Sequence, residues 1–311
     1  MKTSKIYLSL VIALVACSMA FTSCRKRDKK TDEEPDTEQG TANDNNLAET
    51  SSSDIESMGS QVSEAGSLST YKFNGPVSGA EILSVAPCAT ISGIGTGTVT
   101  VDFGTTGCTG TDGRVRTGKL FFDFSASSPT TSIYYRNPGF KMIVTSQNYV
   151  VDGNQVTINN KSITNTTPAG APAGTNLTWA VSANISIVKP NNEGTVNWTC
   201  NRTKELINTN DPLCYNGQTT PINWTKAKIK LNGTASGVNA KGENFTATAS
   251  NLVRDFTCAP DVSRPHRHPF VSGTISYTPG NRPTRLIDFG SGSCDLVGTI
   301  TINSQTFSFN F

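Results

Sequence analysis

Apolar and polar residues alternate in short runs from about residue 68 to the end of the chain. In residues 98–103 every second side chain is apolar and the others are Thr or Asp, which is typical of a strand with one buried face. Similar runs occupy residues 119–125, 140–144, 149–151, 155–158, 177–188, 195–199, 222–224, 227–231, 245–249, 271–277, 285–289, 299–302 and 306–311. The pattern therefore predicts many short strands.

The segments between these runs are rich in turn-forming residues. Asp152-Gly153-Asn154 is typical of a hairpin turn, and no long stretch beyond residue 68 has the apolar spacing of a helix. We therefore predict an all-β fold, either an antiparallel β-sandwich or a strongly curved multi-stranded sheet. It is expected to form a single domain over residues 68–311.

One short motif occurs near both ends of this β-rich region. Residues 102–108 and 288–294 each read Asp-Phe-Gly, then three small residues, then Cys. The glycine permits a sharp turn after the strand, and the cysteine can tie that turn to a neighbouring strand. A protein kinase also contains Asp-Phe-Gly, but this chain lacks the catalytic loop and the Gly-rich loop of kinases. The motif is interpreted as structural.

The first 23 residues have the features of a bacterial lipoprotein signal peptide. Lys2 and Lys5 precede an apolar run that is shorter than the roughly 20 residues of a transmembrane helix. In such signals a cysteine becomes the lipid-modified first residue, and Cys17 and Cys24 compete for that role. We predict Cys24, because the apolar residues 19–21 belong in the signal and a charged segment follows Cys24 directly.

Residues 24–67 are predicted to be a flexible charged tether. They contain no aromatic residue and too little apolar surface to offset the entropy of the chain. A short helix is expected at residues 54–64, where Ser53 and Glu56 form a capping-box pair and Gly66 can end the helix. Its apolar face would consist of Ile55, Met58 and Val62.

Charge is distributed unevenly between the tether and the rest of the chain. Residues 25–64 hold 5 basic and 11 acidic residues, whereas the remainder after the signal holds 19 and 13. The basic excess of the body is spread out, and no cluster interleaves basic with aromatic residues. We therefore predict no nucleic-acid partner.

The body contains six cysteines, an even number in a chain with an export signal. This arrangement predicts disulfides, and sequential pairing is the simplest of the fifteen connectivities. The expected pairs are Cys88 with Cys108, Cys200 with Cys214, and Cys258 with Cys294. No metal site is expected, because the cysteines lie far apart and form no C-x-x-C motif.

Few residues are suited to catalysis. The only histidines, His266 and His268, lie in one Pro-flanked segment and are expected to be exposed in a loop. The strand acids most suited to a carboxylate pair are Asp102, Asp123 and Asp288, but an acid at a strand end more often caps a turn. We therefore predict that the protein is not an enzyme and uses no cofactor.

Three tryptophans bear on the question of a ligand. Trp179, Trp198 and Trp224 can stack on sugars, but each lies in an alternating strand, so core packing is expected. An apolar pocket would favour a lipid ligand, whereas a row of exposed tryptophans would favour a glycan. A convex surface without a pocket would favour a structural role.

Several short stretches of the chain together match a known pattern. They are Cys24, residues 101–105 and Cys108, 112–114 before 118–119, 233–237, Cys258 and 272–275, and 287–290 and Cys294. On these residues the chain resembles a family of uncharacterised lipoproteins from the Bacteroidota. The resemblance covers most of the body and implies an envelope location and a β fold, but it brings no activity and no site residues.

These features predict an outer-membrane lipoprotein, anchored by its N-terminal lipid, that acts as a structural or interaction module. A lipid- or glycan-binding protein is the alternative, and a glycan-acting enzyme comes third. Possible partners are a glycan, a lipid or an envelope protein. The basic residues 25–27 after Cys24 depart from acidic surface-export tags, so both the periplasmic face and the cell surface stay open as locations.

Overall fold

A computed structural model describes residues 38–69, 77–78, 86–93, 97–130, 134–261 and 268–310. In these residues one α-helix, α2 (Gly40–Ser69), precedes fifteen strands. Two 3-10 helices lie in loops, η2 (Pro190–Asn192) and η3 (Trp224–Lys226). The strands are β1 (Val77–Ser78), β2 (Thr90–Ser92), β3 (Thr98–Asp102), β4 (Cys108–Thr109), β5 (Val115–Asp123), β6 (Lys141–Val151), β7 (Asn154–Asn165), β8 (Leu177–Val188), β9 (Thr195–Leu206), β10 (Lys228–Val238), β11 (Asn244–Asp255), β12 (Phe270–Pro279), β13 (Arg285–Ser291), β14 (Val297–Ile302) and β15 (Gln305–Asn310).

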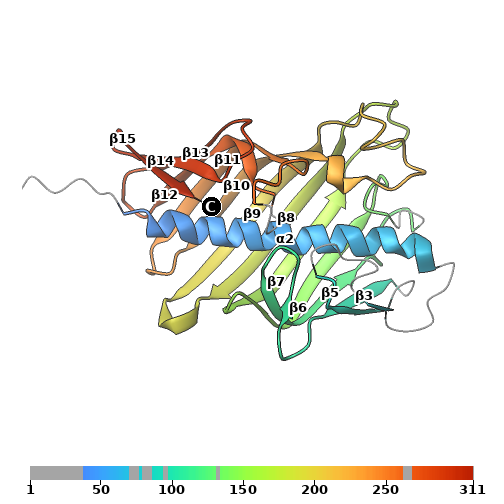
Figure 1. Ribbon diagram of the computed structural model, residues 1–311, viewed down its shortest axis with the longest axis horizontal. Helices are drawn as coiled ribbons and strands as arrows, with labels where there is room; N and C mark the ends of the chain where they lie inside the picture. The colour runs from blue at the N-terminus through green and yellow to red at the C-terminus, as the bar shows by residue number, and fades with distance from the viewer. Residues whose placement is uncertain are drawn as a thin grey trace, which may run out of the picture. The chain divides into compact units, whose positions relative to one another are not determined.

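The strands form a single antiparallel sheet in which almost every strand pairs with its neighbours in the sequence. The order runs from β1 to β15 without a crossover, and only β4 lies off this path, paired with β5. Figure 1 shows the sheet curving around α2, which lies across the strands. The all-β prediction is confirmed, in the form of one strongly curved sheet.

Alternation along the strands places the core between the sheet and the helix. In β8 every second residue is buried, beginning with Leu177, Trp179 and Val181. The residues between them are mostly Thr, Ser and Asn on the opposite face, where the Ser162 and Ser182 hydroxyls of neighbouring strands lie 3.1 Å apart. One face of the sheet is therefore apolar and covered, and the other is polar.

The helix is the main departure from the sequence prediction. Residues 40–67 were expected to belong to a flexible tether with a short helix at 54–64, and this is wrong, because α2 spans Gly40–Ser69. The expected apolar face is correct, since Ile55, Met58 and Val62 are at most 1% exposed. The body therefore includes α2, and residues 24–37 lie outside the described part of the chain.

Close packing of α2 against the sheet depends on small residues. A Cβ atom on Gly59 would lie 2.5 Å from the Met142 Sδ atom and 2.8 Å from a ring carbon of Phe122. Much of the buried helix surface is polar, as Asn45, Ser51 and Ser60 illustrate. No helix in the described residues is both long enough and apolar enough to span a membrane.

Candidate functional site

Two long loops at one end of the sheet enclose a groove of about 670 Å³. One loop joins β7 to β8 and the other joins β9 to β10. The residues that line the groove are Thr167, Gly170, Ala171, Pro172, Ala173, Gly174, Thr175, Leu177, Thr209, Asn210, Pro212, Tyr215, Asn216, Gly217 and Gln218. This volume lies within the range of about 300–1,000 Å³ that small-molecule sites occupy.

Side chain to backbone hydrogen bonds hold the two loops in place. Thr209 Oγ1 donates to the Gly174 carbonyl at 3.0 Å and lies 3.0 Å from Asn176 Oδ1, so it joins one loop to the other. Asp211 Oδ1 accepts from the Leu213 amide at 2.9 Å, which is a local turn that Asp favours. These hydrogen bonds fix the positions of the two loops that form the walls of the groove.

The lining of the groove carries no formal charge. Amide side chains project from Asn210, Asn216 and Gln218, which are exposed. Tyr215 forms part of the floor, and burial raises the pKa of its hydroxyl, although nearby Arg136 opposes the rise. Amides and hydroxyls both donate and accept hydrogen bonds, so the groove suits a neutral ligand that carries many hydroxyl groups.

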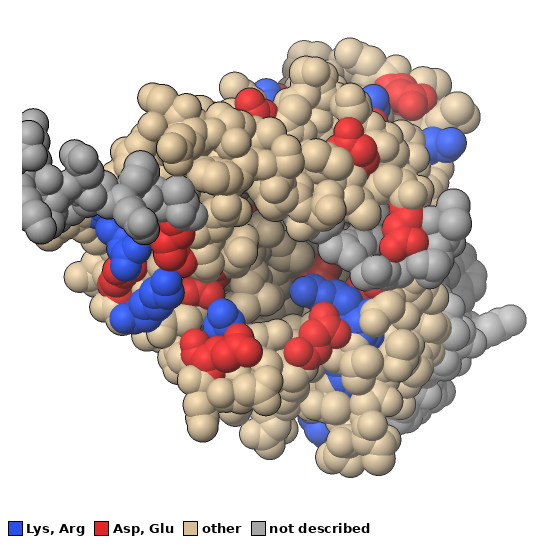
Figure 2. Space-filling model, turned by 60° about the vertical axis from the view of Figure 1, so that its left-hand side comes forward, with Lys and Arg blue, Asp and Glu red and all other residues tan. Residues whose placement is uncertain are grey.

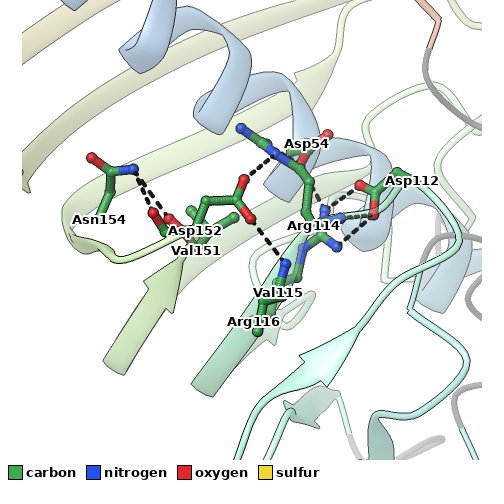
Figure 3. Close-up of polar contacts among 8 residues, drawn as sticks. All are labelled: Asp54, Asp112, Arg114, Val115, Arg116, Val151, Asp152 and Asn154. Atoms are coloured by element: carbon green, nitrogen blue, oxygen red, sulfur yellow. Dashed lines mark hydrogen bonds and ion pairs between the residues drawn. The ribbon is translucent and has the colours of Figure 1, made fainter. Parts of the chain in front are cut away.

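Ion pairs fasten α2 to the sheet, with the acids on the helix and the bases on strands and loops. In Figure 3 the Asp54 carboxylate lies between Arg114 and Arg116, at 2.6 and 2.9 Å. Burial by itself would raise the pKa of Asp54, but the two guanidinium groups outweigh burial and lower it. The remaining pairs are Asp44–Lys189, Glu49–Arg202, Glu56–Lys161, Glu56–Lys204 and Glu64–Arg136.

Charged groups also reach the surface as neighbouring pairs. Figure 2 shows acidic beside basic side chains around a hollow, with wide uncharged areas between them. Lys241 pairs with Glu38 at 2.9 Å, and Arg282 pairs with Glu243 at 2.7 Å. The visible face therefore has no broad area of one charge sign.

Two of the three expected disulfides are confirmed. Cys88 is bonded to Cys108 and Cys258 to Cys294, with Cα–Cα distances of 5.5 and 5.4 Å. Both repeats of the Asp-Phe-Gly motif therefore lead into a disulfide.

The expected bond between Cys200 and Cys214 is wrong, and both thiols are free and buried. Cys200 lies in the middle of β9, whereas Cys214 lies in the loop beyond it. Cys200 lies roughly 20 Å from the end of β9 at about 3.3 Å of rise per residue, and the Cys214 sulfur lies beyond that end, 3.6 Å from Asn208 Oδ1. The two cysteines are therefore too far apart for a disulfide. Burial raises the pKa of Cys200 to about 12 and that of Cys214 to about 11, so neither is a ready nucleophile.

The three strand acids cap turns, as expected. The carboxylates of Asp102, Asp123 and Asp288 each accept a hydrogen bond from the backbone amide two residues ahead, at 2.8–2.9 Å. In the Asp-Phe-Gly repeats that amide belongs to a glycine with positive φ, at Gly104 and Gly290. Asp102 and Asp123 lie at opposite ends of the paired strands β3 and β5, and Asp288 lies in β13, so these three described residues form no carboxylate pair.

The remaining sequence candidates have mixed outcomes. Trp179 and Trp198 are buried in the core, as expected, and half-buried Trp224 packs against it. His268 Nδ1 lies 2.8 Å from the Cys258 carbonyl, and the residue is only partly exposed. His266 lies outside the described residues. The same holds for Cys17 and Cys24.

Sequence reasoning missed the groove and the polar helix interface. The groove is made by loops whose residues show no periodic pattern, although the richness of Asn, Gln and Thr in 207–220 was a usable signal. The opposite charges of residues 25–64 and of the body were the signal for the helix. Among the described residues, no group of three or more His, Cys, Asp or Glu is arranged to hold a metal ion.

Comparisons with protein families, with curated proteins and with solved structures give no match to this chain. The resemblance to Bacteroidota lipoproteins stays a prediction.

Proposed function

We propose that this protein is an outer-membrane lipoprotein whose body is an interaction module, and that the groove between its two long loops binds an uncharged saccharide. The observation that carries the proposal is the lining of the groove, which combines amides, hydroxyls and one tyrosine without a charged side chain. The anchor would be the lipid on Cys24, as the signal peptide predicts.

The lining favours a saccharide over the other ligand classes. An acyl chain would need a mainly apolar cavity, whereas this groove mixes small apolar side chains, such as Ala171 and Pro172, with polar loop atoms. A strongly charged ligand would lack an ionic partner there. The side chains of Asn210 and Asn216 have no hydrogen bond to other described side chains or backbone groups, so a ligand can use their donors and acceptors.

The test is calorimetric titration of the purified protein with maltotriose and N-acetylchitotriose, and with trigalacturonate as a charged trisaccharide. We expect a neutral trisaccharide to bind. The double change Asn210→Ala and Asn216→Ala should weaken binding about tenfold or more, since each lost hydrogen bond costs about 1 kcal/mol. The control Asn201→Ala, on the exposed face of β9, should leave binding unchanged.

Two outcomes would contradict the proposal. One is that trigalacturonate binds as tightly as the neutral sugars. The other is that the double variant keeps full affinity, which would place any sugar elsewhere. If none of the neutral trisaccharides binds, the groove is not a saccharide site and the interaction role must use another surface.

A further inference from the structure

A second, smaller cavity of about 40 Å³ lies under α2. Its walls combine charged groups, Glu56, Lys204 and Arg254, with the aromatic side chains of Trp224, Phe256 and Phe270. The cavity is separate from the loop groove, with which it shares no lining residue. A ligand in this cavity would therefore use none of the residues of the proposed saccharide site.

Arg254 differs from the other basic groups that face the helix. Arg202 pairs with Glu49, and Lys204 pairs with Glu56 at 2.9 Å. The side chain of Arg254 is partly exposed and has no ion pair or hydrogen bond to any described residue, and its buried Nε atom is without an acceptor. The guanidinium carbon of Arg254 lies 4.8 Å from the centroid of the Phe270 ring.

Unused hydrogen-bond donors line this cavity. The indole Nε1 of Trp224 is buried without an acceptor. Lys204 donates to Glu56 Oε1 and to the Tyr135 hydroxyl, which leaves one of its three protons available. Glu56 makes no ion pair with Arg254, and its carboxylate is held by Lys204, Lys161 and Tyr135.

A partly buried cation without an ion pair and buried donors without acceptors are costly unless a ligand pairs with them. A carboxylate meets both needs, because it is anionic and accepts several hydrogen bonds. The aromatic walls suit the carbon atoms next to such a group. A water-sized group needs about 10–15 Å³ of such volume, so a cavity of about 40 Å³ encloses little more than a carboxylate group.

We propose that this cavity binds the carboxylate of a small organic acid, with Arg254 as its ionic partner and Trp224 as a second donor. Any larger part of the acid would extend past the half-buried Trp224 and Phe256 side chains toward solvent.

The test uses calorimetric titration of the purified full chain with propionate, and with propionamide as an uncharged molecule of the same shape. We expect propionate to bind at least tenfold more tightly than propionamide. Arg254→Met should weaken propionate binding at least tenfold, whereas Arg254→Lys should retain part of it. The control Lys226→Met removes an exposed positive charge and should change nothing.

A stability measurement separates a binding arginine from a structural one. Without ligand, Arg254→Met should unfold at the same temperature as the parent or a higher one, because it removes a partly buried charge that has no ion pair. Propionate should raise the unfolding temperature of the parent and not that of the variant.

The proposal is overturned if propionate does not bind, which would mean that the cavity holds water only. It is also overturned if propionamide binds equally well, or if Arg254→Met keeps full affinity. A variant that unfolds at a clearly lower temperature without ligand would assign Arg254 a structural role instead.

Discussion

Replacing Glu56 with Gln would test the role of buried charge under the helix. Glu56 Oε1 accepts from the Tyr135 hydroxyl at 2.7 Å and from Lys204 Nζ at 2.9 Å, and Oε2 lies 3.6 Å from Lys161 Nζ. Glutamine keeps the shape of the side chain and removes its charge. Lys161 is fully buried, and its other bond is to the Ser52 hydroxyl, so the change leaves it without a counter-ion.

The lowered pKa of Glu56 and the usual cost of breaking a buried ion pair both indicate the size of the effect. Burial by itself would raise the pKa of Glu56, but Lys204 and Lys161 outweigh burial and lower it from 4.5 to about 2. That difference corresponds to about 3 kcal/mol in the free energy of unfolding. Removing one partner of a buried ion pair costs about 3–5 kcal/mol. We therefore expect Glu56→Gln to destabilise the protein by about 3 kcal/mol near neutral pH.

The sign of the pH dependence follows from the lowered pKa. Ionised Glu56 is favoured by folding, so its contribution is fully present above about pH 5 and is lost as the pH falls through about 2. Urea unfolding followed by tryptophan fluorescence should show the difference between parent and variant shrinking over that window.

The control for this experiment is Glu193→Gln. Glu193 is 54% exposed and lies 3.7 Å from Lys189, and such surface pairs contribute about 0–1 kcal/mol. The reasoning is refuted if both variants lose the same stability, or if the loss caused by Glu56→Gln does not depend on pH.

Three further predictions concern the anchor, the thiols and the helix packing. Cys24→Ala should release the protein from membranes in cell fractionation and Cys17→Ala should not; the reverse result would mean that Cys17 carries the lipid. Peptide mapping without reduction should find Cys200 and Cys214 as thiols that react only after unfolding, because burial raises their pKa values to about 12 and about 11; a peptide that links them would contradict the structure. Gly59→Ala should lower stability in urea by about 1–3 kcal/mol, since the new Cβ would lie 2.5 Å from a methionine sulfur of β6; an unchanged midpoint would mean that the interface relaxes freely.

Strands and turns could be predicted because their signals are local. Alternation in residues 98–103 requires only that one face be buried, and β3 has that burial pattern. Asp152 and Gly153 both have positive φ, as the expected hairpin turn requires. The turns of the Asp-Phe-Gly repeats likewise depend on an acid and a glycine two residues apart.

The full length of the helix and the separation of Cys200 from Cys214 could not be predicted from local patterns, because the contacts that decide them are distant in sequence. Asp54 and Glu56 look like solvated charges until Arg114 and Lys204 are brought beside them. An even number of cysteines gives no distances between them, so the sequence did not indicate that Cys200 and Cys214 are too far apart to bond. The groove depends in the same way on contacts between two loops that the sequence does not connect.

The position of α2 at the start of the body has a consequence for the order of folding. Synthesis proceeds from the N-terminus, yet Glu49 of the helix pairs with Arg202, which is 153 residues further along the chain. A segment so rich in Ser, Thr and Asn has little tendency to form a helix alone, whereas each strand of the sheet can add to the one made just before it. We therefore expect α2, the first of the described elements to be synthesised, to pack onto the sheet only after the basic strands beneath it have formed.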